Sequence, residues 1–142
     1  MNSQITYLYR DGSNYKRYNT VIVKGKMTSA HLARIEKCLF DGEYFVPRSV
    51  GLPEERSTDY RTDDDHCWFE WEIYQDDATG EYDLDYSGVE LTDTEANVDL
   101  TVDELVANFE AVQQWDETGW MDDYDYRAYD ELTPGDYAFG AF

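Results

Sequence analysis

The chain has 142 residues and a formal net charge of −21, and 42% of its residues are hydrophobic and 16% aromatic. This length suits one compact domain with or without an extension, and the hydrophobic content argues against a chain that is disordered throughout. The charge is uneven, because residues 1–61 are mildly basic whereas residues 62–142 hold most of the acids and one basic residue, Arg127.

Two runs of β-branched and aromatic residues open the chain, Ile5–Tyr9 and Thr20–Lys24, and turn-forming residues separate them. They predict a hairpin with a long connection. Thr28 is the predicted N-cap of a helix that ends at Gly42. Its apolar residues recur at helical spacing: Leu32, Ile35 and Leu39.

Residues 42–66 predict a long connector, and a loop of that length in a small domain is often functional. Two further strands are expected at Cys67–Tyr74 and Glu81–Tyr86, on either side of a turn. Apolar residues and acids alternate along both strands, so one outer face is expected to carry only acids. These acids are Glu70, Glu72, Glu81, Asp83 and Asp85.

The second helix has the clearest local signals. Thr101 and Glu104 form a predicted capping box, and Leu100 and Leu105 a hydrophobic staple. After Trp115 the sequence mixes acids with aromatic residues. That segment predicts either a short helix at Met121–Glu131 packed on the body or a mobile arm that orders on a partner.

The predicted fold is therefore α+β, in the order ββαββα, with an antiparallel sheet, two main helices and an acidic, aromatic C-terminal arm. We expect one domain over residues 1–115, mildly basic in 1–61 and strongly acidic in 62–115. Residues 116–142 are expected to form the acidic, aromatic extension.

The acidic face of the second hairpin suggests a function. Residues on one face of a strand are about 6.6 Å apart, a spacing of the same order as that of phosphates along a nucleic-acid strand. Like charges opposed across a ladder destabilise it, so a row of five needs a reason. The functional interpretation is phosphate mimicry, and the alternative is a solvated face on an acidic protein. Adaptation to high salt would acidify the whole surface, yet residues 1–61 are net positive.

The C-terminal extension would lengthen this strip, with aromatic rings filling pockets that normally stack bases. The residues that we expect to contribute there are Trp120, Asp122, Asp123, Tyr124, Asp125 and Tyr126. The basic residues near the first hairpin are expected to dock against the chain's own acids or to be solvated, rather than to bind nucleic acid. They are Arg10, Lys16, Arg17, Lys24 and Lys26.

Metal and catalytic signals are weak. A calcium loop starting at Asp83 would place Thr94 at its twelfth position, where glutamate is needed. The loop Asp63–Cys67 offers mixed ligands without a second cluster. Motifs of serine hydrolases, zinc proteases and nucleotide-binding proteins are absent, so we expect no cofactor, no metal and no enzyme activity. A carboxylate-dependent hydrolase using acids within 63–72, such as Glu70 with Glu72, is the enzymatic alternative.

The two cysteines, Cys38 and Cys67, form no disulfide framework or CxxC motif, and the N-terminus lacks a signal-peptide pattern. No apolar run approaches the length of a membrane span. We therefore expect a cytoplasmic protein with no membrane partner.

Three segments resemble a family of short, uncharacterised bacterial proteins: YRDGSNYK (Tyr9–Lys16), GEYFVPRSVGLP (Gly42–Pro53) and DDHCWFE (Asp64–Glu70). The resemblance covers roughly the first half of the chain and the second helix, and it implies a bacterial host cell. It names no activity, so no functional residue carries over. In charge and size alone, the chain is also similar to phage and plasmid DNA-mimic inhibitors.

We therefore predict a non-enzymatic inhibitor of anti-CRISPR or anti-restriction type. Its partner would be a nucleic-acid-binding protein, such as a CRISPR effector or a subunit of a restriction enzyme. The rival from another class is a small cytosolic adaptor that binds a protein through its loop Val46–Pro53.

Overall fold

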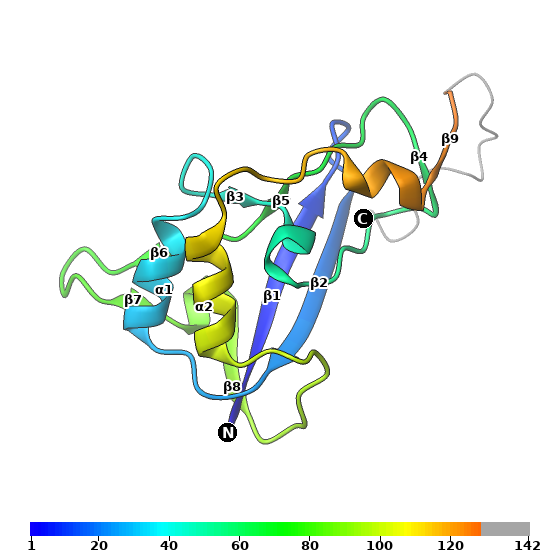
Figure 1. The fold of residues 1–142 in the computed structure, drawn as a ribbon. Coiled ribbons are helices and arrows are strands. Elements are labelled where there is room, and N and C mark those ends of the chain that lie inside the picture. The colour runs from blue at the N-terminus through cyan, green and yellow to red at the C-terminus, as the bar shows by residue number, and fades with distance from the viewer. Residues whose placement is uncertain (129–142) are drawn as a thin grey trace.

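The computed structural model describes residues 1–128, and its central element is a long antiparallel hairpin (Figure 1). β1 (Asn2–Arg10) pairs along its whole length with β2 (Lys16–Val23). Both strands extend beyond the predicted runs, which leaves a short turn. The carboxylate of Asp11 closes that turn by accepting the backbone N–H groups of Ser13 and Tyr15, both at 2.9 Å.

β1 forms hydrogen-bonded pairs with three other strands. On the side away from β2, its first half pairs with β8 (Val89–Thr92) and its second half with β5 (Phe69–Glu70). β3 (Tyr44–Phe45) lies outside β5, so the order is β2-β1-β5-β3 with β8 also on β1. All these pairs are antiparallel.

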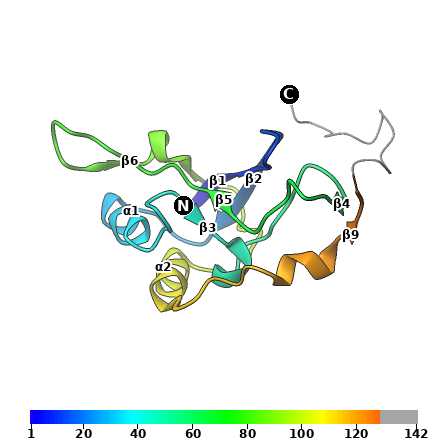
Figure 2. The ribbon, with the colours of Figure 1, turned by 90° about the horizontal axis from the view of Figure 1, so that it is seen from above.

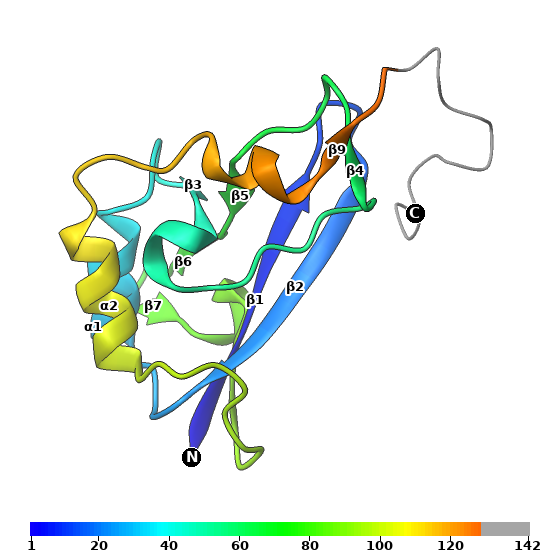
Figure 3. The ribbon, with the colours of Figure 1, turned by 45° about the vertical axis from the view of Figure 1, so that its right-hand side comes forward.

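Both helices cover the same face of the sheet, as Figures 2 and 3 show. α1 (Ser29–Glu36) and α2 (Val102–Ala111) lie side by side, and each begins at a capping box. Thr101 and Glu104 cap α2 as predicted. At α1 the cap Thr28 is also confirmed, with His31 as its partner. α1 ends at Glu36, before the predicted end at Gly42, because the chain then turns and Phe40 forms a β-bridge with Tyr44.

The core lies between the helices and the sheet. Alternate residues of β1 point into it, and Ile5, Tyr7 and Tyr9 are almost wholly buried. Rings of several elements meet there: Tyr7, Phe45, Phe69, Trp71 and Phe109. The buried Tyr7 hydroxyl donates to the carbonyl of Pro53, and that of Tyr9 donates to Asp65, which satisfies both polar groups.

The second predicted hairpin is much smaller than expected. β5 is two residues long, and after it the chain leaves the sheet. β6 (Tyr74–Gln75) and β7 (Tyr82–Asp83) then pair over two residues each, in a hairpin that projects beside α1 (Figure 1). The 3-10 helix η2 (Asp85–Ser87) replaces the end of the second strand. The α+β class with two helices and an antiparallel sheet is confirmed, but the order ββαββα is not.

Four further short elements form a second layer beside the hairpin. They are the 3-10 helices η1 (Pro47–Val50) and η3 (Gly119–Asp123), and the strands β4 (Tyr60–Arg61) and β9 (Asp125–Tyr126). β4 and β9 pair in parallel. Residues 116–126 thus pack on the body instead of forming a separate extension. The predicted helix Met121–Glu131 is absent as far as residue 128, and the remainder of the predicted arm lies outside the described residues.

None of the helices within residues 1–128 has the length and apolar character needed to cross a membrane.

We expect Gly88→Ala to destabilise the protein more than Gly80→Ala. Their φ angles are 73° and 75°, so both variants share the same backbone strain. A Cβ at Gly88 would lie 2.9 Å from the carbonyl oxygen of Thr6 on β1, whereas at Gly80 nothing lies within 4 Å. The additional clash should lower the free energy of unfolding, measured in urea, by about 1–3 kcal/mol beyond the control. Equal losses would contradict the close approach of η2 to β1.

Candidate partner-binding surface

The five carboxylates predicted to form a row do not lie on one regular ladder. Glu70 on β5 is 18% exposed and ion-paired, with its Oε2 3.0 Å from Nε of Arg10. Asp83 on β7 accepts the backbone N–H of Tyr86 at 2.9 Å. The other three are exposed, but they lie on a loop, before β7 and on η2: Glu72, Glu81 and Asp85. The expectation of an ordered row is wrong, because the hairpin is only two residue pairs long.

The C-terminal residues of the predicted strip also separate into two groups. Trp120 is only 1% exposed and packs against Val46 and Cys67, so it is not available to a partner in this conformation. Asp123 is ion-paired, with its Oδ2 2.6 Å from Nη2 of Arg48. Tyr124 is half-buried. The exposed members of the predicted strip here are Asp122, Asp123, Asp125 and Tyr126, and of these Asp123 is held by Arg48.

A buried arginine explains why this segment packs inward. The side chain of Arg56 is 2% exposed, and its Nη1 lies 3.2 Å from Oε1 of Glu54. Its Nη2 donates to the carbonyl of His66 at 3.0 Å. Four ring centroids lie between 4.5 and 5.7 Å from its guanidinium carbon: Tyr9, Phe69, Trp120 and Tyr124. Ring faces attract cations, and a buried charge needs a counter-ion.

Two further cations, Lys24 and Arg34, also pair with the chain's own acids. Lys24 lies 2.9 Å from Asp99, and the guanidinium of Arg34 contacts Glu110 through two nitrogen atoms. The hydrogen bond from Arg34 is the main cause that lowers the pKa of Glu110. The predicted docking of basic residues on the acidic half is confirmed for Arg10 and Lys24.

Two further ion pairs were not predicted. Arg17 pairs at 2.8 Å with Glu55, which belongs to its own half of the chain. His31 has a side chain that is 18% exposed. It places Nε2 3.0 Å from Oδ1 of Asp103 and so links the first turns of the two helices.

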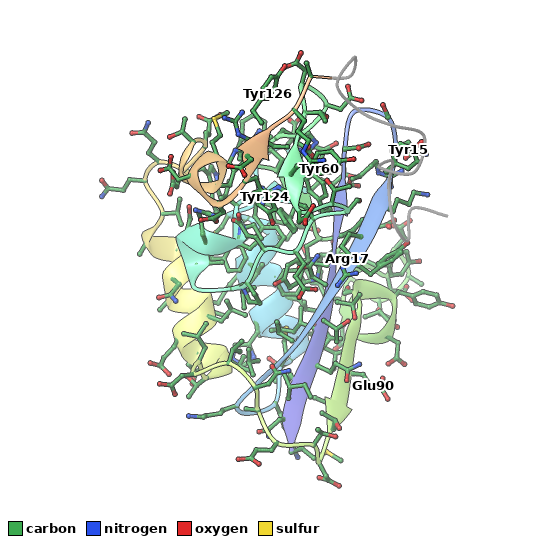
Figure 4. All side chains as sticks on the ribbon, turned by 90° about the vertical axis from the view of Figure 1, so that its right-hand side faces the viewer. Tyr15, Arg17, Tyr60, Glu90, Tyr124 and Tyr126 are labelled. Carbon is green, nitrogen blue, oxygen red and sulfur yellow. The ribbon has the colours of Figure 1, made fainter. Side chains whose placement is uncertain are left out.

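After this pairing, the surface formed by residues 62–128 keeps many carboxylates that have no cationic partner within the described residues. They are spread over the loop after β4, the β6–β7 hairpin, η2, β8, the loop that follows β8, the first turn of α2 and the approach to β9. Figure 4 labels one of them, Glu90, on β8. The exposed members are Asp63, Glu72, Asp77, Glu81, Asp85, Glu90, Asp93, Glu95, Glu104, Asp116, Glu117, Asp122 and Asp125.

The face of the sheet opposite the helices holds a groove of about 250 Å³. Leu8 of β1 lies in its floor, between Tyr18 of β2 and Glu70 of β5 as cross-strand neighbours. Tyr86 of η2 and the loop residue Glu72 complete its wall. The side chains of Tyr18 and Tyr86 are highly exposed, 63% and 76%.

A larger hollow of about 660 Å³ lies near β4. Arg17, Tyr60 and Tyr124 contribute to it from β2, β4 and the residue after η3 (Figure 4). Three arginines line it, Arg17, Arg56 and Arg127, and three carboxylates do so as well, Glu54, Glu55 and Asp59. Arg17 pairs with Glu55 and Arg56 with Glu54. Its residues therefore offer no excess positive charge that would favour an anionic ligand.

The metal and catalytic candidates are engaged in structural contacts. Asp64 accepts from the hydroxyl of Ser13, and Asp65 from that of Tyr9. Among residues 1–128, no three His, Cys, Asp or Glu side chains are placed to hold a metal ion. Burial raises the pKa of the Cys67 thiol to about 11 and also raises that of Cys38. Neither thiol is therefore an activated nucleophile.

Comparisons with protein-family models, with curated proteins and with solved structures find no match for this chain. The resemblance to short bacterial proteins stays an expectation.

The groove on the sheet was missed from the sequence. The alternation in β2 places Tyr18 and Thr20 on one face of the strand and the buried Val21 on the other. This pattern could have predicted that Tyr18 lies on the outer face of the sheet. The position of Tyr86 had no such signal, because it was expected to lie on the inward face of a strand.

Trp120→Ala should destabilise the protein by about 3–5 kcal/mol, because it opens a cavity between Val46, Cys67 and Arg56. Trp120→Phe should lose less, since a ring remains over the guanidinium. Met121→Ala, at an exposed neighbour, should change the free energy of unfolding by no more than about 0.5 kcal/mol. Urea unfolding measures all three. A Trp120→Ala protein as stable as the Met121→Ala protein would show that this segment is not packed on the body.

Proposed function

We propose that this chain is a non-enzymatic binding protein whose acidic surface occupies the nucleic-acid-binding surface of a partner protein. The observation that carries the proposal is the division of charge in the fold. Within residues 1–128, six of the eleven Lys and Arg side chains form ion pairs with acids of the chain itself. The unpaired remainder of the surface is dominated by exposed carboxylates over residues 62–128.

Such a surface has a physical cost and a physical use. Like charges that are not neutralised repel one another and destabilise the compact state. The same field attracts a basic surface over distances of about 10 Å at 0.1 M salt and accelerates association with it. Proteins that bind DNA or RNA present basic surfaces of this kind, because neutralising phosphates supplies much of their affinity.

The concrete form of the proposal is an inhibitor of anti-CRISPR or anti-restriction type, with a CRISPR effector or a restriction-enzyme subunit as the partner. Its support is the acidic field and the size of the chain. Imitation of phosphates by an evenly spaced row does not support it, because Glu70 is neutralised and the other acids lie on different elements.

The two rival functions have less support. The adaptor would bind through Val46–Pro53, but Val46, Pro47, Val50 and Leu52 are buried in the body and cannot contact a partner as they stand. The hydrolase would use carboxylates within 63–72, and three of these accept hydrogen bonds from Ser13, Tyr9 and Arg10.

The test is inhibition and binding of purified CRISPR effectors and restriction enzymes by the full chain. Binding to a true partner should weaken steeply as NaCl rises from about 50 to about 300 mM, and duplex DNA should compete for it. The triple variant Glu81→Gln, Glu90→Gln, Glu95→Gln should weaken binding at low salt by more than about tenfold.

A matched control removes the same charge from the first part of the chain. Asp41→Asn, Glu43→Gln, Asp59→Asn changes three exposed acids there, and Asn suits the positive φ of Asp41. We expect this control to bind within about threefold of the unmodified protein. Binding that is insensitive to salt, equal losses in the two triple variants, or no binding across the panel would contradict the proposal.

A further inference from the structure

The groove on the open face of the sheet has a fixed shape, because η2 is held in place on three sides. Trp71 Nε1 donates to the carbonyl of Ser87 at 2.8 Å, and the backbone N–H of Tyr74 donates to the side-chain Oγ of Ser87 at 2.9 Å. The carbonyl of Gly88 accepts the N–H of Thr6 on β1 at 2.9 Å. Tyr86 therefore stands beside the sheet on an anchored turn.

The groove also presents two aromatic rings to solvent. Tyr18 is 63% exposed and Tyr86 is 76% exposed, and the ring of Tyr74 supports Tyr86 at a centroid distance of 5.3 Å. Exposed rings that are clustered and held in place are typical of binding sites rather than of inert surface.

The charge inside the groove is negative and incompletely matched. Arg10 neutralises Glu70, with which it forms an ion pair of 3.0 Å. Glu72 lines the same groove, is exposed and has no ion pair within residues 1–128. One carboxylate is therefore left to receive a cation at the edge of two tyrosine rings.

We propose that this groove binds one arginine side chain of the partner protein. The guanidinium would lie against the rings of Tyr18 and Tyr86 and form a charge-assisted hydrogen bond with the carboxylate of Glu72. Its aliphatic part would lie over Leu8. This inference rests on the proposed function and deepens it, since it names the group of the basic partner that is recognised.

Size and chemistry favour arginine as the occupant. The groove, about 250 Å³, is smaller than the roughly 300–1,000 Å³ of typical small-molecule sites, and suits a single side chain. A guanidinium is planar and stacks on aromatic faces, which an ammonium does less well. The chain stabilises its own arginines in this way. The guanidinium carbon of Arg127 lies 4.7 Å from the ring centroid of Tyr60, and that of Arg61 lies 5.2 Å from Tyr126.

The direct test uses small probes and NMR on the full chain. N-acetyl-arginine methylamide should shift the methyl signals of Leu8 and the ring signals of Tyr18 and Tyr86 in a saturable way. The lysine analogue should bind several-fold more weakly. The citrulline analogue, which is nearly isosteric but uncharged, should cause no saturable shift. Equal responses to arginine and citrulline, or shifts spread evenly over all the acidic loops, would overturn the inference.

Four variants at three positions identify the contacts. Glu72→Gln should weaken arginine binding by at least about threefold, whereas Glu81→Gln, which removes the same charge outside the groove, should not. Tyr86→Ala should also weaken binding, and Tyr86→Phe should restore it because the ring is kept. All three positions are exposed or half-exposed loop and turn positions, so the fold should survive, and the backbone spectrum reports whether it does. A Glu72→Gln protein that binds the arginine probe as tightly as the Glu81→Gln protein would refute the role of the groove.

The two proposals can fail separately. If partner binding is salt-sensitive and is reduced in the triple variant but unchanged in Glu72→Gln, the acidic surface is the binding site and the arginine groove is wrong. If the arginine probe saturates the groove but no nucleic-acid-binding protein is bound, the groove is correct and the proposed function is wrong.

Discussion

The structure depends on ion pairs that a small number of arginine side chains form between different segments of the chain. Arg10 joins the central hairpin to β5, Arg34 joins the two helices, and Arg48 and Arg56 hold η3 against the body. Arg56 is the extreme case, because it is buried beneath four rings and paired with Glu54. Breaking a buried pair leaves an uncompensated charge, which costs about 3–5 kcal/mol. Six of the positive charges thus form ion pairs with the chain's own acids within residues 1–128, and most of the acids that remain without such a pair are exposed.

This division relates the fold to the proposed function. The elements that carry most of the unpaired acids are short and irregular, and they surround the sheet instead of forming its main strands. A loose field of carboxylates attracts any basic surface and selects little among partners. Selection requires groups in fixed positions. The groove between Tyr18, Tyr86 and Glu72 supplies such groups, because η2 is tied to β1 through Gly88 and to Trp71 through Ser87.

Local signals in the sequence predicted local structure well. The N-cap at Thr28 and the capping box of Thr101 and Glu104 depend on residues close together in the sequence, and both form. The alternation of apolar and acidic residues also agrees with the burial of Phe69 on β5 and of Trp71 directly after it. The predictions that failed concern residues whose contacts lie far away in the sequence. Nothing near Glu70 indicates that Arg10 will neutralise it, and nothing near residue 120 indicates a buried arginine that draws Trp120 inward. The alternation of acids predicted a strand as far as Tyr74, but β5 ends at Glu70. The next residue, Trp71, donates hydrogen bonds to the carbonyls of Glu43 and Ser87, which are distant in the sequence.

Carboxyl footprinting tests the division of charge most directly. Water-soluble carbodiimide and glycine amide would modify carboxylates in the native full chain, and mass spectrometry would rank their rates. The account predicts fast modification of the exposed acids Glu72, Glu81, Glu90 and Glu95, and slow modification of the paired acids Glu54, Glu70 and Asp123. If Glu70 and Asp123 react as fast as Glu72 and Glu81, the arginines do not hold these carboxylates, and the account is wrong.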